Sequence, residues 1–301
     1  MGKSQQVQDL RRWIGRWGLA AIWAPQPLLS GPAFAAALDP RSDSFRATVS
    51  LALWAVWAVT LVATLVPRTA TLTLVRVVLP AAVAAAGWAA LATAEPGWRD
   101  ALALASTATA AVVSLAPATG ECFVNGSSYG SEKRFPLRAP GLVAIGLAES
   151  VWAAVVVGAT AGPLLLAAGE WVAGIAGLVI GWPLAYTGSR SLHRLAQRWL
   201  VFVPAGITVV DPLTLTDPIA VSRARITAIG PAPADTVAHD LTAGALGLAL
   251  QVSLAEPLAI APLRTTHAST TEVVEVVDVL VTPTRPGAVL READARGLPL
   301  S

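Results

Sequence analysis

The 301-residue chain is 54% hydrophobic and only 13% charged, and its mean hydropathy is +0.61. Soluble domains carry about 25% charged residues, so these values exclude an ordinary soluble protein and indicate several membrane spans. Residues 1–198 hold 15 Lys/Arg against 9 Asp/Glu, whereas residues 199–301 hold 6 against 10. A basic first part and an acidic second part argue against nucleic-acid binding, which requires a basic surface. The expected partner is therefore a lipid bilayer, and no nucleic acid is expected.

Residues 1–16 form a polar, basic segment that is expected to lie in the cytoplasm. The apolar stretch 17–38 follows and is interrupted by three prolines and a glycine. It is interpreted as a broken first membrane helix, because neighbouring helices can bond the backbone groups that Pro and Gly leave free. The alternative is a cleaved signal peptide with small residues at 35–37 as its cleavage site.

Five further apolar segments approach the roughly 20 residues that a membrane helix needs. They are residues 46–66, 72–94, 100–116, 141–168 and 170–188. With 17–38 they predict an α-helical transmembrane bundle of six spans over residues 17–188. One side of this topology receives 12 Lys/Arg and the other receives 3, and by the positive-inside rule the larger set is cytoplasmic. Both termini and the 118–140 loop are therefore expected on the cytoplasmic side of the cell membrane of a bacterium.

Three arginines, Arg190, Arg194 and Arg198, recur every four residues directly after the last span. On a helix they would form one stripe, and a cationic stripe marks the cytoplasmic end of a membrane helix. Residues 189–198 are interpreted as a basic juxtamembrane connector that these arginines anchor.

The pattern changes at Trp199, where short β-branched runs and turn residues begin. A Pro-Ala-Gly turn at 204–206 predicts a hairpin, and a helix is expected after Pro286 and before Gly297. The run 273–281 favours a strand, although acidic residues at a spacing of three leave a helix open. The expected strands are 199–203, 207–210, 213–216, 225–229, 248–254, 258–261 and 273–281. Residues 199–301 are thus expected to be a small β-rich soluble domain with a C-terminal helix.

This order of strands and closing helix resembles the PH-like domains of bacterial membrane proteins. The matching residues are the opening hairpin Trp199–Asp211 and the segment Val279-Leu-Val-Thr-Pro-Thr-Arg-Pro-Gly-Ala-Val-Leu290. The whole chain also resembles uncharacterised actinobacterial polytopic membrane proteins that carry a helix bundle followed by such a domain. The PH-like resemblance covers about a third of the chain. It implies a fold and no activity.

Glu149 is a carboxylate inside the apolar segment 141–168. If the helix starts at Gly141, Glu149 lies near the bilayer midplane, where carboxylates are costly and often functional. If the helix begins nearer Leu147, the carboxylate lies in the headgroup region or pairs with an arginine. Both interpretations stay open.

The polar loop 119–138 combines glycines and hydroxyl side chains with three cations. Such a loop could hold a phosphate or a lipid headgroup, although it lacks the P-loop pattern. The alternative is a structured connector that packs on the soluble domain, with apolar contacts from Phe135 and Trp199. The candidate functional residues of this loop are Asn125, Lys133, Arg134 and Arg138.

No motif indicates catalysis, a cofactor or a metal. The three histidines are scattered, and Cys122 has neither a base nor a disulfide partner. We therefore expect a protein that is not an enzyme: a non-catalytic membrane anchor or scaffold whose PH-like domain binds a protein partner. The alternative is a small transporter or channel that uses Glu149 in the membrane.

Overall fold

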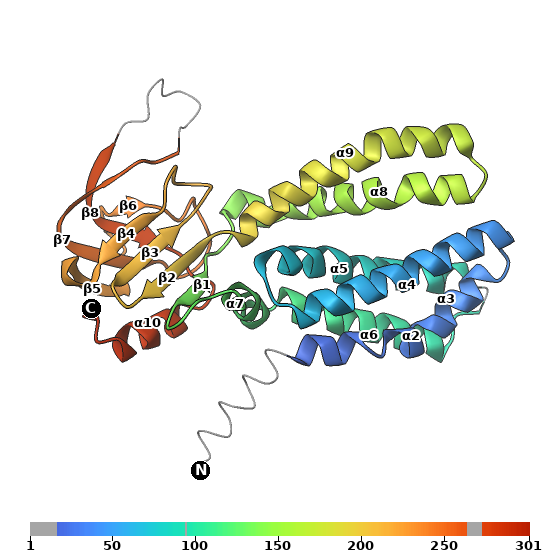
Figure 1. The fold of residues 1–301 in the computed structure, drawn as a ribbon, viewed down its shortest axis with the longest axis horizontal. Coiled ribbons are helices and arrows are strands. Elements are labelled where there is room, and N and C mark those ends of the chain that lie inside the picture. The colour runs from blue at the N-terminus through green and yellow to red at the C-terminus, as the bar shows by residue number, and fades with distance from the viewer. Residues whose placement is uncertain (1–16, 94, 264–272) are drawn as a thin grey trace, which may run out of the picture. The chain divides into compact units, whose positions relative to one another are not determined.

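The computed structural model describes residues 17–93, 95–263 and 273–301. The described residues divide into two units (Figure 1). The helical unit holds the described residues up to Gly126 together with Ser150–Leu192, and the β-rich unit holds Ser127–Glu149 and His193–Ser301. The chain thus passes between the units three times, and the β-rich unit is built from two separate segments.

Long apolar helices dominate the helical unit. Its helices are α2 (Gln26–Leu29), α3 (Gly31–Leu38), α4 (Asp43–Leu65), α5 (Thr69–Ala92), α6 (Trp98–Leu115), α7 (Pro117–Asn125), α8 (Ala148–Ala167) and α9 (Trp171–Ala196). Four helical segments in the described part are long and apolar enough to cross a membrane: α4, α5, Val143–Ala167 and α9. The pair α6 and α7, bent by 61°, makes a fifth if it is one span. The chain is therefore a multi-pass membrane protein.

The stretch 17–38 is helical in pieces. Helix runs to Trp23 and breaks at Pro25 and again at Ser30, so no described piece reaches the length of a span. Trp23 is buried, and its indole N–H donates to the carbonyl of Trp57 at 3.0 Å, while the Trp57 indole donates back to the carbonyl of Trp23 at 3.3 Å. The prolines interrupt the stretch as expected, and a sixth span stays a prediction.

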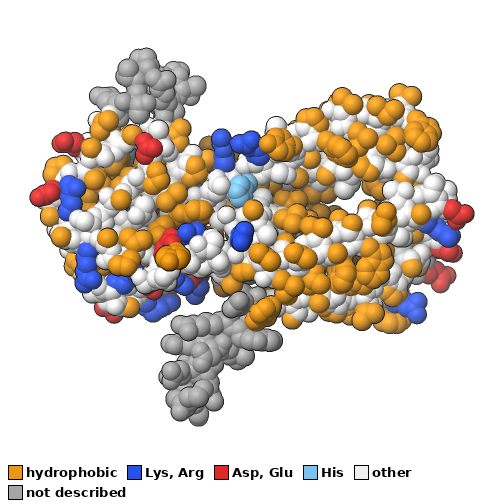
Figure 2. Space-filling model, viewed as in Figure 1, with side chains coloured by type: hydrophobic (Ala, Val, Ile, Leu, Met, Phe, Trp, Pro, Cys, Tyr) orange, Lys and Arg blue, Asp and Glu red, His pale blue; other side chains and the backbone are white. Residues whose placement is uncertain are grey.

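Helices α8 and α9 form a closely packed hairpin. A Cβ on Gly158 would lie 2.5 Å from the carbonyl oxygen of Gly181, so only glycine permits this approach. The outward sides of α9 carry large apolar side chains that are more than half exposed, including Ile175, Val179 and Trp182. Figure 2 shows hydrophobic side chains along the middle of the long helices and charged ones toward their ends, as lipid contact requires.

The β-rich unit consists of two four-stranded sheets around one core. The first sheet has the order β1 (Lys133–Pro136), β2 (Trp199–Val203), β3 (Gly206–Val210) and β4 (Ile219–Ser222), all antiparallel. The second has the order β5 (Ile226–Pro231), β7 (Leu250–Ile260), β8 (Val274–Val281) and β6 (His239–Asp240), with β6 parallel to β8. Inward-facing residues of both sheets form the core together with Val289 and Ala293 of α10 (Pro286–Ala295).

Several sequence predictions for this unit are confirmed. The 199–210 hairpin, the strand at 273–281 and the closing helix are present, and Gly297 has the left-handed φ of +65° that favours glycine after a helix. Residues 248–254 and 258–261 belong to one strand, β7, with a register shift between Ser253 and Leu258. The strand expected at 213–216 is wrong: this segment is a turn with one isolated bridge, between Leu215 and Pro262.

Strand β1 comes from the segment between α7 and α8, which the sequence analysis treats as a loop. Phe135 pairs with Leu200 across β1 and β2 and is buried in the core, where its ring meets Phe202 edge-on at 5.6 Å. The connector thus packs on the β-rich domain as an edge strand. Two paired strands must lie on one side of a membrane, so an even number of spans separates β1 from β2, as α8 and α9 provide.

Candidate functional site

A buried arginine lies at the junction where the chain returns to the β-rich unit. Arg198 was expected to continue the stripe of Arg190 and Arg194, but α9 ends at Ala196 and Arg198 lies just before β2. Its side chain is 1% exposed. The stripe therefore consists of Arg190 and Arg194 alone, and Arg198 belongs to the interior of the β-rich unit.

The guanidinium of Arg198 is bonded on all sides. Its Nε and Nη2 atoms donate to the two carboxylate oxygens of Asp211 at 2.8 and 2.6 Å, and Nη1 donates to the carbonyl of Arg138 at 2.5 Å. The backbone N–H of Leu213 also donates to Asp211, at 3.0 Å. Because a buried charge is tolerated only when it is paired and hydrogen-bonded, this ion pair fixes three segments of the unit to one another.

A second arginine contact covers the neighbouring tryptophan. The Arg134 guanidinium lies 5.5 Å from the ring of Trp199 and donates to Glu132 at 2.7 Å and to Ser127 at 3.1 Å. The hydrogen bond from Arg134 holds the pKa of the Glu132 carboxyl below its usual value. Arg134 therefore fixes the indole of Trp199 by a cation–π contact, which adds about 0.5–1 kcal/mol at exposed sites.

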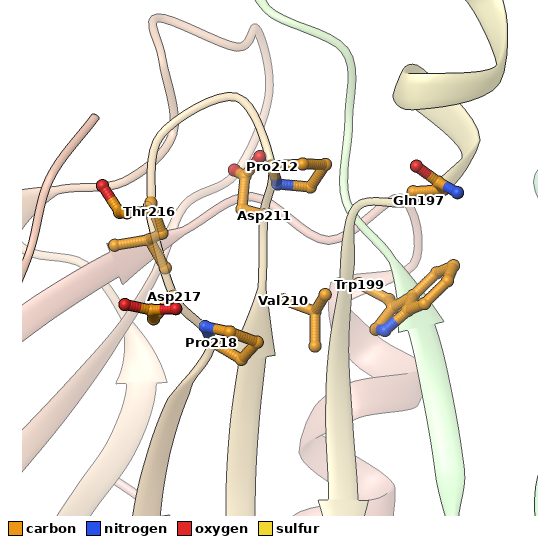
Figure 3. A pocket seen from close by; sticks show the side chains of 9 residues that line it. Gln197, Trp199, Val210, Asp211, Pro212, Thr216, Asp217 and Pro218 are labelled. Carbon is orange, nitrogen blue, oxygen red and sulfur yellow. The ribbon is translucent and has the colours of Figure 1, made fainter. Parts of the chain in front are cut away.

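A shallow pocket of about 260 Å³ opens beside Trp199 (Figure 3). The start of β2, the end of β3 and the turn that follows β3 form its walls. The two Asp-Pro steps of the sequence supply Pro212 and Pro218, and Asp217 is exposed at the rim. The lining residues are Gln197, Trp199, Val210, Asp211, Pro212, Leu215, Thr216, Asp217 and Pro218. A pocket of this size and lining suits one apolar side chain, and the Asp217 carboxylate favours a cation beside it.

The other three candidates of the 119–138 loop have structural contacts. Asn125 ends α7, and its amide donates to the carbonyl of Glu121 at 2.8 Å. The Lys133 ammonium lies 5.8 Å from the ring of Phe135. The backbone N–H of Arg138 donates to the carbonyl of Thr282 at 2.8 Å. None of these three residues lines the pocket beside Trp199.

Glu149 lies in the first turn of α8. The chain kinks at Ile145 and Gly146, where Gly146 has a φ of +92°, and α8 begins at Ala148. The Glu149 carboxylate is exposed and accepts the backbone N–H of Gly146 at 3.0 Å. This geometry corresponds to the interpretation in which the helix begins near Leu147, with Glu149 as an N-terminal cap.

The cysteine and the histidines of the described ranges lie apart from one another. Cys122 is a partly buried thiol on α7, His193 contacts Gln197, and His239 lies on β6. His267 falls outside the described residues. Among the described residues, no group of three or more His, Cys, Asp or Glu could hold a metal ion.

Taken together, the fold and site define a multi-pass membrane protein that carries a β-rich unit with a closing helix and a small apolar pocket. The chain matches no family model, and comparisons with curated proteins and with solved structures also give no match. Neither the pairing of Asp211 with Arg198 nor the pocket at Asp217 is among the sequence predictions. Their sequence signal is the pair of Asp-Pro steps at 211–212 and 217–218, which is typical of turns.

Proposed function

We propose that the chain is a non-catalytic membrane anchor or scaffold and that its β-rich unit is a PH-like, cytoplasmic interaction module. The observation that carries this proposal is the pocket beside Trp199, built directly onto the buried pair of Arg198 and Asp211. A rigid, pre-formed surface binds a partner without the entropy cost of ordering loops. Three chain passages tie this surface to the spans.

The architecture of the unit supports the PH-like assignment. Two four-stranded sheets, antiparallel except for the short strand β6, enclose one core, and a helix near the end of the chain contributes Val289 to that core. Strand β1, contributed by the segment between two membrane helices, adds a strand beside β2. The proposed module is therefore a PH-like fold whose edge strand comes from the separate segment that precedes α8.

Charge supports a cytoplasmic position. The β-rich unit as the structure delimits it contains 11 Lys/Arg and 12 Asp/Glu, so it is close to neutral. The connections next to the spans hold the cations, including Arg190 and Arg194 near the end of α9. Positive charge beside membrane helices is retained on the cytoplasmic side.

The pocket defines the chemistry of the partner. Trp199, Pro212 and Pro218 offer apolar walls, while the exposed Asp217 offers one negative charge. The partner that fits is a protein segment with an apolar side chain next to a Lys or Arg.

Site-specific photocrosslinking in native membranes tests this function. A photoreactive residue replaces Thr216, an exposed pocket residue, in the full-length chain, and Ala224, exposed outside the pocket, is the matched control position. The proposal predicts a protein adduct of discrete mass from position 216 and none from 224. Adding Asp217→Lys should weaken that adduct, because it reverses the charge at the rim. Equal adducts at both positions, or none at 216, would contradict the proposal.

A further inference from the structure

The loop between β6 and β7 is apolar and exposed. Residues 241–249 contain no charged side chain, and two of its leucines face outward: Leu246 is 61% and Leu248 is 48% exposed. The pocket described above does not include them. Single exposed leucines are ordinary on a folded unit, so the significance of these two depends on what the loop is bonded to.

This loop is attached to the residues that lead into a membrane span. The backbone N–H of Gly141 donates to the carbonyl of Gly244 at 3.2 Å. The two backbones approach so closely that a Cβ on Gly141 would lie 2.5 Å from that oxygen and 3.8 Å from Cγ of Leu246. The candidate span Val143–Ala167 begins two residues after Gly141. The loop is therefore bonded to the residues that lead into this candidate span.

The segment 142–147, which leads into α8, carries exposed apolar side chains. Leu142, Ile145 and Leu147 are 87%, 69% and 54% exposed. These side chains precede or open the span, so lipid is the natural environment for them. The loop leucines lie on a segment bonded to this one, and lipid contact is the environment that both segments share.

The first half of this loop is hydrogen-bonded within the protein. The N–H of Thr242 donates to the carboxylate of Asp240 at 2.7 Å, and the N–H of Gly244 donates to the Thr242 hydroxyl at 3.2 Å. The N–H of Ala245 donates to the carbonyl of Thr242 at 3.1 Å. These three bonds order the turn that directly precedes Leu246 and Leu248.

We propose that the loop 242–248 inserts Leu246 and Leu248 into the lipid interface beside the start of α8. The loop is a second, non-spanning membrane contact of the β-rich unit and fixes the orientation of that unit toward the bilayer surface. The inference rests on the membrane spans and does not depend on the proposed scaffold function or on the pocket beside Trp199.

Environment-sensitive fluorescence tests the contact. Leu246→Cys, Leu248→Cys and Leu300→Cys are made singly in full-length Cys122→Ser protein, labelled with a nitrobenzoxadiazole dye, and reconstituted into phosphatidylethanolamine–phosphatidylglycerol vesicles. Leu300 is the matched control because it is 46% exposed and bridges to Ile229 of β5, the edge strand opposite β6 in its sheet. Spin-labelled lipids and aqueous iodide then quench the dye from the two environments.

The proposal predicts that labels at 246 and 248 emit at shorter wavelength than the label at 300. It also predicts that lipids spin-labelled near the glycerol backbone quench them several-fold more strongly than the label at 300, and that iodide quenches them less. Equal iodide quenching at all three positions would overturn it. A blue-shifted label at 246 that lipid spin labels do not quench would also overturn it, because the loop would then be covered by protein.

Discussion

The buried pair of Arg198 and Asp211 should decide the stability of the β-rich unit. Arg198→Met removes the cation but keeps an apolar side chain of similar length, so the Asp211 carboxylate, 0% exposed, is left buried without its partner. Removing one member of a buried ion pair costs about 3–5 kcal/mol. The carbonyl of Arg138 also loses the Nη1 donor. We expect a loss of unfolding free energy in that range.

The assay is thermal or urea unfolding of the full-length chain in detergent. Cleavage of the β-rich unit by a protease reports how much of that unit is unfolded. For a unit of about 130 residues, a loss of 3–5 kcal/mol lowers Tm by roughly 10 °C or more. Arg194→Met is the matched control: Arg194 is exposed on the last turn of α9, and its replacement should change stability by no more than about 0.5 kcal/mol.

The double variant Arg198→Met with Asp211→Leu distinguishes an unpaired charge from lost packing. It removes both charges, so it should be more stable than Arg198→Met alone by about 2 kcal/mol or more, since buried pairs are often replaceable by apolar residues. The lost bond from Leu213 N–H keeps it below wild type by about 1 kcal/mol. If the unfolding midpoint of Arg198→Met equals those of Arg194→Met and wild type, the reasoning about the buried pair is refuted.

Three further predictions concern other parts of the chain. Glu149→Gln should cost only about 0.3–1 kcal/mol of helix capping, measured by thermal unfolding; altered solute flux at normal expression would instead favour the transporter alternative. Gly158→Val should destabilise the α8–α9 hairpin by about 1–3 kcal/mol, because its Cβ would lie 2.5 Å from the carbonyl oxygen of Gly181. Thermal unfolding compares this variant with Ala159→Val at an exposed position, and equal losses of stability in both would contradict the close approach of the two helices. The bond from Arg134 that lowers the pKa of Glu132 stabilises the folded state above pH 4.5, the ordinary Glu value, and this contribution disappears as the pH falls through the lowered folded-state pKa. Arg134→Met should therefore flatten the acid side of a plot of unfolding free energy against pH. An unchanged plot would contradict the stabilisation of Glu132 by Arg134.

Long-period apolar patterns and local turn signals predicted much of this fold. Helices α4 and α5 coincide with long apolar runs, and the hairpin at 199–210 coincides with two short β-branched runs around a Pro-Ala-Gly turn. Local sequence is therefore enough to predict them. Strand β1 could not be predicted, because Lys-Arg-Phe-Pro is short, half charged and becomes a strand only by pairing with β2, some 65 residues later. This segment is a strand because of its tertiary pairing and not because of its local β propensity.

The candidate site shows the same division. A spacing of four correctly placed Arg190 and Arg194 on one helix, but it could not show that the helix ends at Ala196 and leaves Arg198 to the next strand. The role of Asp211 depends on a contact across the sheet, and a sequence shows such a residue only as a turn former. The position of Glu149 depended on where α8 begins, and helix ends are the least certain feature of a sequence pattern.

The central claim is that the β-rich unit is assembled on the cytoplasmic side from two segments separated by the α8–α9 hairpin. Thiol labelling tests it most directly, with Ser131→Cys, Ala224→Cys and Glu170→Cys made singly in Cys122→Ser protein. These positions represent the β1 segment, the second segment and the turn between α8 and α9. A membrane-impermeant maleimide is added to spheroplasts and to inverted membrane vesicles of a bacterial expression host. Positions 131 and 224 should react only in inverted vesicles and position 170 only in spheroplasts; labelling of 131 and 224 from opposite sides, or of both from the outside, would contradict the claim.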